Sequence, residues 1–150
     1  MTRNGEMTDQ PLFVYGSLLE PKVLETLLNR VPETDLAVAQ GFIALQFPGQ
    51  PFPVLVPRAD SVTTGHLLPD LTLEERALLD AFEHPIYDVS KIDVMVSDQS
   101  REAAAYTVSR EKAMAIGAMH PWNLSILQET LGPYLEMCSH FRQNYSEKLS

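Results

Sequence analysis

The sequence has few of the features that mark secreted, membrane-bound or nucleic-acid-binding proteins. Its 150 residues include one cysteine, Cys138, which cannot form an internal disulfide, so nothing in the sequence requires an oxidising compartment. No apolar run approaches the roughly 20 residues of a membrane-spanning helix, and the opening MTRNGEMTDQ lacks the apolar stretch of a signal peptide. We therefore expect a cytoplasmic protein without a membrane partner.

Basic residues are also scarce. There are 11 Lys and Arg against 20 Asp and Glu, which gives a formal net charge of -9. The basic residues are scattered along the chain and do not form a stripe that could neutralise phosphates, so we expect no nucleic-acid partner. The apolar fraction of 45% and the length of 150 residues suit one domain with a substantial core. We expect that domain over residues 11–150, after a flexible polar segment over residues 1–10.

Side chains that could hold a metal or a cofactor are sparse. The sequence has no glycine-rich phosphate loop and no dinucleotide-binding fingerprint. The 4 histidines are too widely spaced for a zinc site, and Cys138 near one of them is too little to complete it; they are His66, His84, His120 and His140. We expect neither a metal nor a cofactor.

The pattern over residues 12–30 predicts a strand, a tight loop and a helix. The apolar run LFVY ends at Gly16, as a buried strand entering a turn would. Pro21 suits the first position of a helix, where its missing N–H costs nothing. The leucines and valine that follow recur at helical spacing; they are Val23, Leu24, Leu27 and Leu28.

The middle of the chain predicts mainly strands. Over residues 41–68, short apolar runs alternate with prolines, which favour edge strands or bulges. Neither face of residues 62–68 is cleanly polar, which indicates a closed or heavily covered sheet. Residues 92–96 alternate between apolar and polar side chains, and the run EAAAYTVS over 102–109 is a further candidate strand.

Two further helices are expected. Thr72 followed by Glu75 matches a capping box, so a helix should start directly after Thr72, and Pro85 limits its length. In the tail after residue 122, apolar residues recur at spacings of three and four, which predicts an amphipathic helix. Gly132-Pro133 should break or kink it. This tail could line a pocket or form an interface.

The turn after the first strand is a candidate anion site. A glycine between a strand and a helix lets a ligand approach the backbone closely, and several N–H groups can point at one spot. The segment Tyr15-Gly16-Ser17-Leu18 has this setting, and Ser17 could add a hydroxyl donor. The same pattern is also typical of an ordinary structural turn.

Glu83 is a candidate acid/base. It follows Leu79 by one helical turn and lies only about 40 degrees from it around the helix axis, at the border of the buried face. Partial burial and the negative end of the helix dipole should both raise its pKa. A carboxyl tuned toward neutrality can accept a proton and return it. The alternative is a solvated glutamate at a frayed helix end.

Together these segments resemble the gamma-glutamylcyclotransferase-like family, which includes gamma-glutamylamine cyclotransferases and bacterial relatives. The resemblance covers most of the chain and rests on LFVYGSL, FPVLVP, VTTGHLLPDL, LLDAFEHPIYD, AAAYTV and Trp122. It implies an α+β fold, a small mixed β-barrel with flanking helices and a pocket at one end. Where relatives commonly have glycine after the glutamate and a basic residue after the tyrosine, this chain has His84 and Asp88.

The resemblance also implies an activity, the cyclisation of a gamma-glutamyl amine or amino acid to 5-oxoproline with release of the amine, without metal or cofactor. In that comparison Glu83 matches the general acid/base. The matching substrate-binding residues are Tyr15, Gly16, Ser17, Leu18 and Tyr87. A non-catalytic module that binds a small carboxylate in the same pocket is the alternative, and an acyl-transfer hydrolase using Ser17 is a third. The leaving amine and the oligomeric state stay open.

Overall fold

The computed structural model describes residues 10–149, and the flexible segment expected over residues 1–10 lies, apart from Gln10, outside them. The described elements follow the chain as β1 (Leu12–Val14), a 3-10 turn η1 (Ser17–Leu19), α1 (Pro21–Leu28), β2 (Asp35–Gln46), β3 (Pro53–Leu68), α2 (Leu73–Glu83), β4 (Asp88–Val96), β5 (Gln99–Thr107), α3 (Arg110–Ile116), α4 (Leu124–Gln128) and α5 (Leu131–Leu149).

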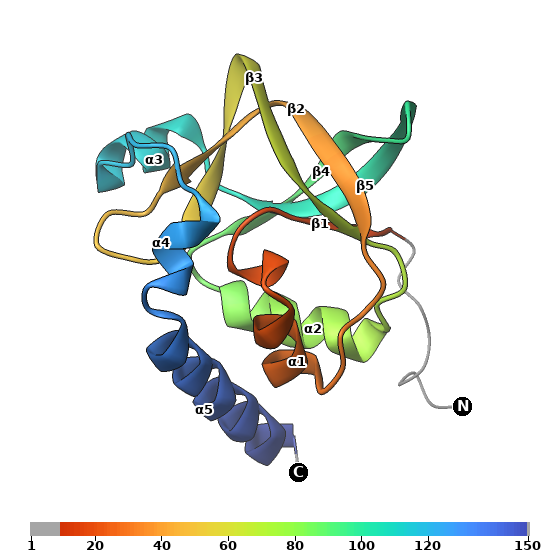
Figure 1. Ribbon diagram of the computed structural model, residues 1–150, viewed down its shortest axis with the longest axis vertical. Helices are drawn as coiled ribbons and strands as arrows, with labels where there is room; N and C mark the ends of the chain where they lie inside the picture. The colour runs from red at the N-terminus through yellow and green to blue at the C-terminus, as the bar shows by residue number, and fades with distance from the viewer. Residues whose placement is uncertain (1–9, 150) are drawn as a thin grey trace.

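The five strands form a closed barrel in the order β1-β3-β2-β4-β5. Neighbouring strands are antiparallel except β1 and β5, which close the barrel as a parallel pair. Figure 1 shows the barrel above a layer of helices formed by α1, α2 and α5. The expected α+β class, a small mixed barrel with flanking helices, is confirmed.

Strand β1 and residues 103–106 of β5 carry apolar side chains on both faces, and both faces are buried there. Phe13 and Ala105 belong to the cluster of side chains that fills the barrel. Val14 and Ala104 point the other way, into a second cluster shared with the helices. An uninterrupted apolar run is the expected signature of a strand covered on both sides, which explains why LFV and AAAY read as they do.

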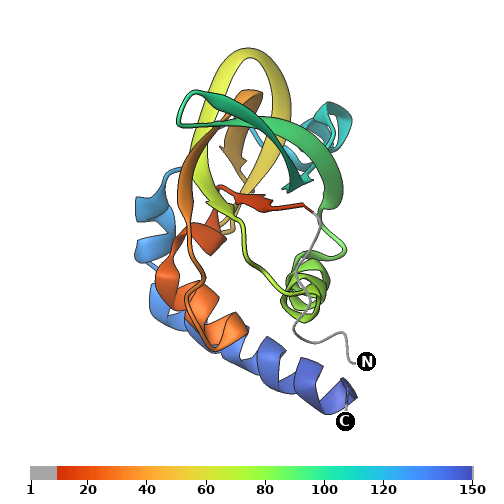
Figure 2. The ribbon, with the colours of Figure 1, turned by 90° about the vertical axis from the view of Figure 1, so that its right-hand side faces the viewer.

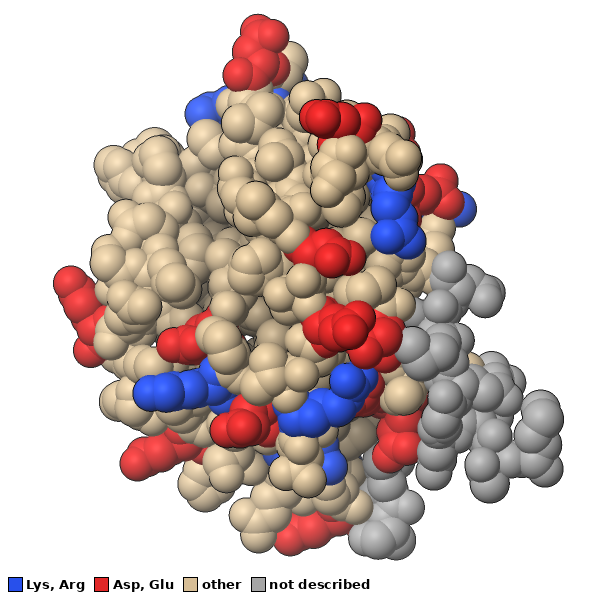
Figure 3. All heavy atoms as spheres, turned by 45° about the vertical axis from the view of Figure 1, so that its right-hand side comes forward, with Lys and Arg blue, Asp and Glu red and all other residues tan. Residues whose placement is uncertain are grey.

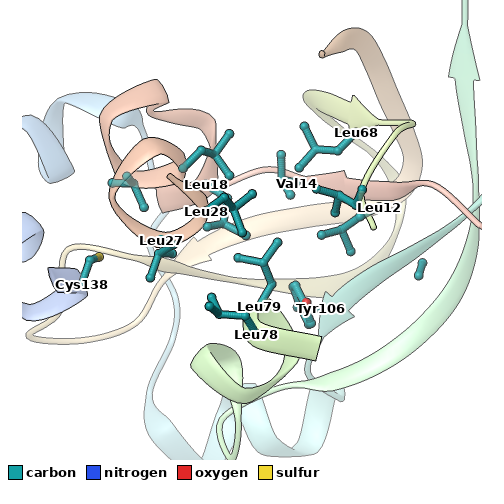
Figure 4. Packing of buried hydrophobic residues seen from close by; sticks show 14 of the residues in the cluster. Leu12, Val14, Leu18, Leu27, Leu28, Leu68, Leu78, Leu79, Tyr106 and Cys138 are labelled. Atoms are coloured by element: carbon teal, nitrogen blue, oxygen red, sulfur yellow. The ribbon is translucent and has the colours of Figure 1, made fainter. Parts of the chain in front are cut away.

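The helical layer packs beneath the barrel through leucines. Figure 4 shows side chains of η1, α1 and α2 meeting under β1, with Cys138 of α5 at one side. In Figure 2, α1 and α2 lie between the barrel and α5. The expected capping box of α2 is present, because the Thr72 side chain accepts from the Glu75 N–H and the Glu75 carboxylate accepts from the Thr72 N–H. Helix α1 begins at Pro21, as predicted.

The prediction of separate short strands over residues 41–68 is wrong, although the bulge that the prolines favoured is present. Residues 53–68 form one 16-residue strand that contains Pro53 and Pro57. The Leu55 carbonyl accepts from the Val108 N–H, so the backbone N–H and C=O groups of Leu55 face away from β2. Pro53 and Pro57 lie two positions before and after Leu55, and residues two apart in a strand direct their backbone groups to the same side. The N–H groups that the prolines lack would therefore also face away from β2, and the β2–β3 ladder loses no donor.

The β2–β3 ladder has an irregularity of the kind that the prolines were expected to cause, and it follows Pro57. Phe42 pairs with Pro57 and Gln40 pairs with Val62, so residues 58–61 of β3 lie opposite Gly41 alone. The β2–β3 register shifts between Gln40 and Phe42, and Gly41 between them has a φ of +84°. A positive φ is available to glycine at little cost. Asp60, among the extra residues of β3, also has a positive φ, of 66°, so both strands contribute to the bulge that bends the ladder.

The predicted tail helix is confirmed, but its break lies earlier than expected. The interruption falls at residues 129–130, between α4 and α5, and Gly132-Pro133 lies inside the first turn of α5. Pro133 is tolerated there because the first N–H groups of a helix have no intrahelical acceptor. Helix α3 was missed, although Ser109 as N-cap and Gly117 in the left-handed conformation after its last residue are recognisable helix boundaries.

We expect Gly65→Ala to lower the free energy of unfolding by about 3 kcal/mol, because it forces overpacking of a closed contact. An added Cβ would lie 2.2 Å from the Val14 carbonyl oxygen and 2.9 Å from Cζ of Phe13. Urea denaturation measures the change. Gly132→Ala is the matched control, since nothing lies within 4 Å of its added Cβ and alanine favours the helix. Equal stability of Gly65→Ala and wild type would contradict this packing.

The surface is acidic but mixed. On the face shown in Figure 3, Lys and Arg lie among Asp and Glu and form no continuous basic stripe. Among the helices of the described residues, none is both long enough and apolar enough to cross a membrane.

Candidate active site

The glycine turn is packed tightly against the start of β3. A Cβ added at Gly16 would lie 2.6 Å from Cδ of Pro53, so only glycine allows this approach. The chain then enters η1, in which the Leu19 N–H donates to the Gly16 carbonyl at 2.9 Å. Ser17 and Leu18 are buried. The turn therefore presents backbone, rather than side chain, at the point where β1 ends.

Glu83 is the last residue of α2, and its position follows from the helix period. Leu79, one turn earlier, is fully buried, and Glu83 is partly buried beside it. The pKa of Glu83 is raised to about 8. Burial is the larger cause, and the negative charge of Asp80, one turn before it, is the smaller one. The predicted effect of burial is confirmed, whereas the contribution of Asp80 was not foreseen.

Tyrosine hydroxyls surround this carboxyl, and each is engaged by a protein acceptor. Tyr15 donates to the Tyr106 carbonyl, and Tyr87 donates to the Pro53 carbonyl at 2.5 Å. Tyr106 donates to the Asp80 carboxylate at 2.6 Å. A network of this kind holds the rings in fixed orientations around the site.

One of these contacts links α5 to the glycine turn. The Tyr134 hydroxyl donates to Oγ of Ser17 at 2.8 Å, across 117 positions of sequence. Burial raises the pKa of Tyr134, as it does for the other three tyrosines, and the neighbouring Glu83 charge raises it further. All four hydroxyls therefore stay protonated at neutral pH and act as hydrogen-bond donors.

Two adjoining cavities meet at Glu83. The first, which we call the inner pocket, brings together every site residue expected from the sequence: Tyr15, Gly16, Ser17, Leu18, Glu83 and Tyr87. The second, which we call the vestibule, lies between the end of α2 and α5. Both are lined by Glu83, Tyr87, Ser17 and Phe52. The two sequence segments that were expected to meet do lie on one cavity.

Sequence reasoning missed several residues at this site. They include Phe52, Pro53 and Tyr106, which line the inner pocket, and Tyr134, which lines the vestibule. The tail had been expected to line a pocket or form an interface, and the structure shows that it lines one. The sequence pattern predicted only that Tyr106 lies in a strand. Nothing in the local sequence could predict a contact between Tyr134 and Ser17.

Other chemistry expected or considered from the sequence finds less support. The hydrogen-bond partner of the Ser17 hydroxyl is Tyr134, and no histidine lines either cavity. His84 is exposed at the end of α2, and Asp88 is exposed at the start of β4. Within residues 10–149, no group of three or more His, Cys, Asp or Glu side chains could hold a metal ion.

Comparison with known proteins points in one direction. A family model described as "Gamma-glutamyl cyclotransferase, AIG2-like" matches residues 12–124. The chain is 40% identical over 96 residues to AIG2-like protein C of Arabidopsis thaliana, across 64% of this chain and 56% of that protein. It is 33% identical over 99 residues to AIG2-like protein D of the same plant, across 66% of this chain and 65% of that protein. The match thus spans less than two thirds of either relative.

Solved structures share the fold. A solution structure of an Arabidopsis thaliana protein has a TM-score of 0.68 at 20% identity, covering 99% of this chain and 89% of that one. A gamma-glutamyl cyclotransferase has a TM-score of 0.59 at 12% identity, covering 79% of this chain and 96% of that one. At these identities the likeness concerns the fold alone. Since the family model covers most of the chain, the resemblance is confirmed, and the protein belongs to the AIG2-like gamma-glutamyl cyclotransferase family.

Proposed function

We propose that the protein cyclises a gamma-glutamyl amine or amino acid to 5-oxoproline and releases the free amine, with Glu83 as general acid/base. Membership of the family supports a cyclotransferase type of function. The observation that carries the finer proposal is the Glu83 carboxyl, which lines one pocket with the glycine turn and has its pKa raised to about 8 by burial.

The reaction needs one group that accepts and returns a proton. The substrate's α-amine attacks its own gamma-carbonyl carbon, a new C–N bond closes the five-membered ring, and the bond to the departing nitrogen breaks. The attacking nitrogen loses a proton and the departing nitrogen gains one. A single carboxyl beside both nitrogens can carry that proton, and such transfer contributes roughly 10²- to 10⁴-fold to the rate.

The pKa of Glu83 suits both halves of this cycle. With the pKa raised to about 8 by burial, roughly one molecule in ten carries the carboxylate at pH 7. A substrate ammonium bound next to Glu83 would stabilise the carboxylate and increase this fraction, because opposite charges favour ionisation. Within residues 10–149, no side chain hydrogen-bonds to the Glu83 carboxyl, so both of its oxygens are available to a ligand.

The glycine turn would hold the anionic part of the substrate. The N–H groups of Ser17 and Leu18 lie at the start of η1, where helical N–H groups have no intrahelical acceptor. They can bind the α-carboxylate or stabilise the oxyanion that develops on the gamma-carbonyl. Either contact would hold the flexible glutamyl chain in the geometry of attack, and a preorganised intramolecular attack can lower the barrier by about 7 to 11 kcal/mol. The ring of Tyr87 would form the adjacent wall.

Incubation with a panel of gamma-glutamyl amines and gamma-glutamyl amino acids tests the proposal. We expect 5-oxoproline to appear in a one-to-one ratio with free amine for at least one member, measured by mass spectrometry. Binding of the panel without any 5-oxoproline would instead favour the non-catalytic module that binds a small carboxylate. Turnover that survives at Glu83 substitution but is lost in Ser17→Ala would favour the hydrolase.

A further inference from the structure

The vestibule next to Glu83 is apolar. Its lining residues beyond those shared with the turn are Phe82 and Ile86 from the end of α2 and the following loop, and Tyr134, Met137 and Phe141 from α5. Phe52 contributes from the loop before β3. Of the described residues that line it, Glu83 is the only Asp, Glu, Lys, Arg or His. Apart from Glu83, the vestibule therefore offers apolar contact area and no charged partner.

The wall formed by α5 is held in place. The Phe82 and Phe141 rings pack edge to face with centroids 5.2 Å apart, and Phe82 meets Tyr134 in the same way at 6.5 Å. Arg142, the residue after Phe141, donates through Nη1 to the Leu27 carbonyl at 2.6 Å, which ties α5 to α1. A rigid apolar wall recognises shape and apolar surface with little ordering cost.

This wall lies outside the part of the chain that the family model matches. The match ends at residue 124, and α5 begins at Leu131. All ten residues that line the inner pocket lie in the matched part, whereas three of the nine residues that line the vestibule, Tyr134, Met137 and Phe141, come from α5. The two cavities thus differ in that only the vestibule includes residues from beyond the matched part.

We propose that the vestibule binds the leaving part of the substrate and selects an uncharged, bulky apolar group, aliphatic or aromatic. The inference rests on the proposed function: once the glutamyl part occupies the glycine turn and its gamma-carbonyl lies at Glu83, the departing amine continues from Glu83 into the adjoining vestibule. There a methylene placed in an apolar pocket improves kcat/KM by roughly tenfold or more. A charged group loses water without gaining a partner.

A pair of nearly isosteric substrates tests this selection. We expect kcat/KM for gamma-glutamyl-hexylamide to exceed that for gamma-glutamyl-(5-aminopentyl)amide by at least roughly tenfold, since the pair exchanges a terminal methyl for an ammonium. Gamma-glutamyl-methylamide, which cannot fill the vestibule, should be turned over less efficiently than the hexylamide. The assay follows 5-oxoproline for all three.

A charge placed in the vestibule locates the effect. Met137 is 46% exposed, so Met137→Glu should fold, and we expect it to lower kcat/KM for the hexylamide roughly tenfold without lowering that for the aminopentylamide. Met114→Glu introduces the same charge at an 80% exposed position on α3 and should leave both values unchanged. Turnover without preference for the hexylamide, or a Met137→Glu effect equal for both substrates, overturns this inference alone. No turnover of any of the three overturns this inference, and the proposed function is overturned as well if the full panel of gamma-glutamyl amines and amino acids also yields no 5-oxoproline.

Discussion

Glu83→Gln is expected to lower kcat for 5-oxoproline formation by roughly 10²- to 10⁴-fold, the range that a positioned general acid/base supplies. The amide has nearly the shape of the acid, but it neither accepts a proton at neutral pH nor returns one. The inner pocket should persist because Leu79 and the tyrosines around Glu83, rather than the carboxyl itself, hold its walls. Ligand affinity by calorimetry should therefore change far less than turnover.

The control for this result is Glu136→Gln, which makes the same change at an exposed position on α5. Its turnover should equal that of the wild type. Retention of more than a tenth of the wild-type kcat by Glu83→Gln would show that another group carries the proton. Loss of ligand binding along with turnover would indicate that the carboxyl holds the substrate instead of transferring a proton.

The local parts of the fold could be predicted from the sequence because local rules determine them. The strand before Gly16, the proline at the start of α1 and the Thr72 capping box each depend on neighbours within a few positions. The strands that failed did so for a non-local reason. Whether Pro57 breaks a strand depends on which neighbour its missing N–H faces, and that is determined by a register that no local pattern reveals.

The candidate site divides in the same way. Glu83 could be placed at the edge of a buried face from helical periodicity, and Gly16 from its position between a strand and a helix. Their meeting required the family resemblance, because no spacing rule brings together residues 67 positions apart. Tyr134 could not be found at all, since its contact with Ser17 depends on how α5 crosses α1 and α2.

The raised pKa of Glu83 also predicts how stability depends on pH. The unfolded chain should titrate this carboxyl near 4.5, whereas burial, with a further contribution from Asp80, raises the pKa in the folded protein to about 8. Below pH 4.5 both states hold the proton, so folding costs nothing at this residue. As the pH rises from 4.5 to 8, the unfolded state releases the proton first, so the folded state loses stability across this window. Above it the loss is complete.

Glu83→Gln removes this titration, so its stability relative to the wild type should rise between pH 4.5 and 8 and then level off. The rise of the Glu83 pKa from 4.5 to about 8 corresponds to at most about 5 kcal/mol in the free energy of unfolding. Partial contact of the carboxyl with water should reduce the stability gained by Glu83→Gln to roughly half of that. A domain of this size should then melt about 5 to 10 °C higher than the wild type at pH 9 and almost identically at pH 4. Thermal melts of both proteins across this range measure the difference, in which every other titrating group cancels. A difference that stays constant with pH would mean that Glu83 ionises as an ordinary surface carboxyl. A catalytic acid/base needs a shifted pKa, and the burial that shifts the pKa of Glu83 also makes its ionisation destabilise the folded protein.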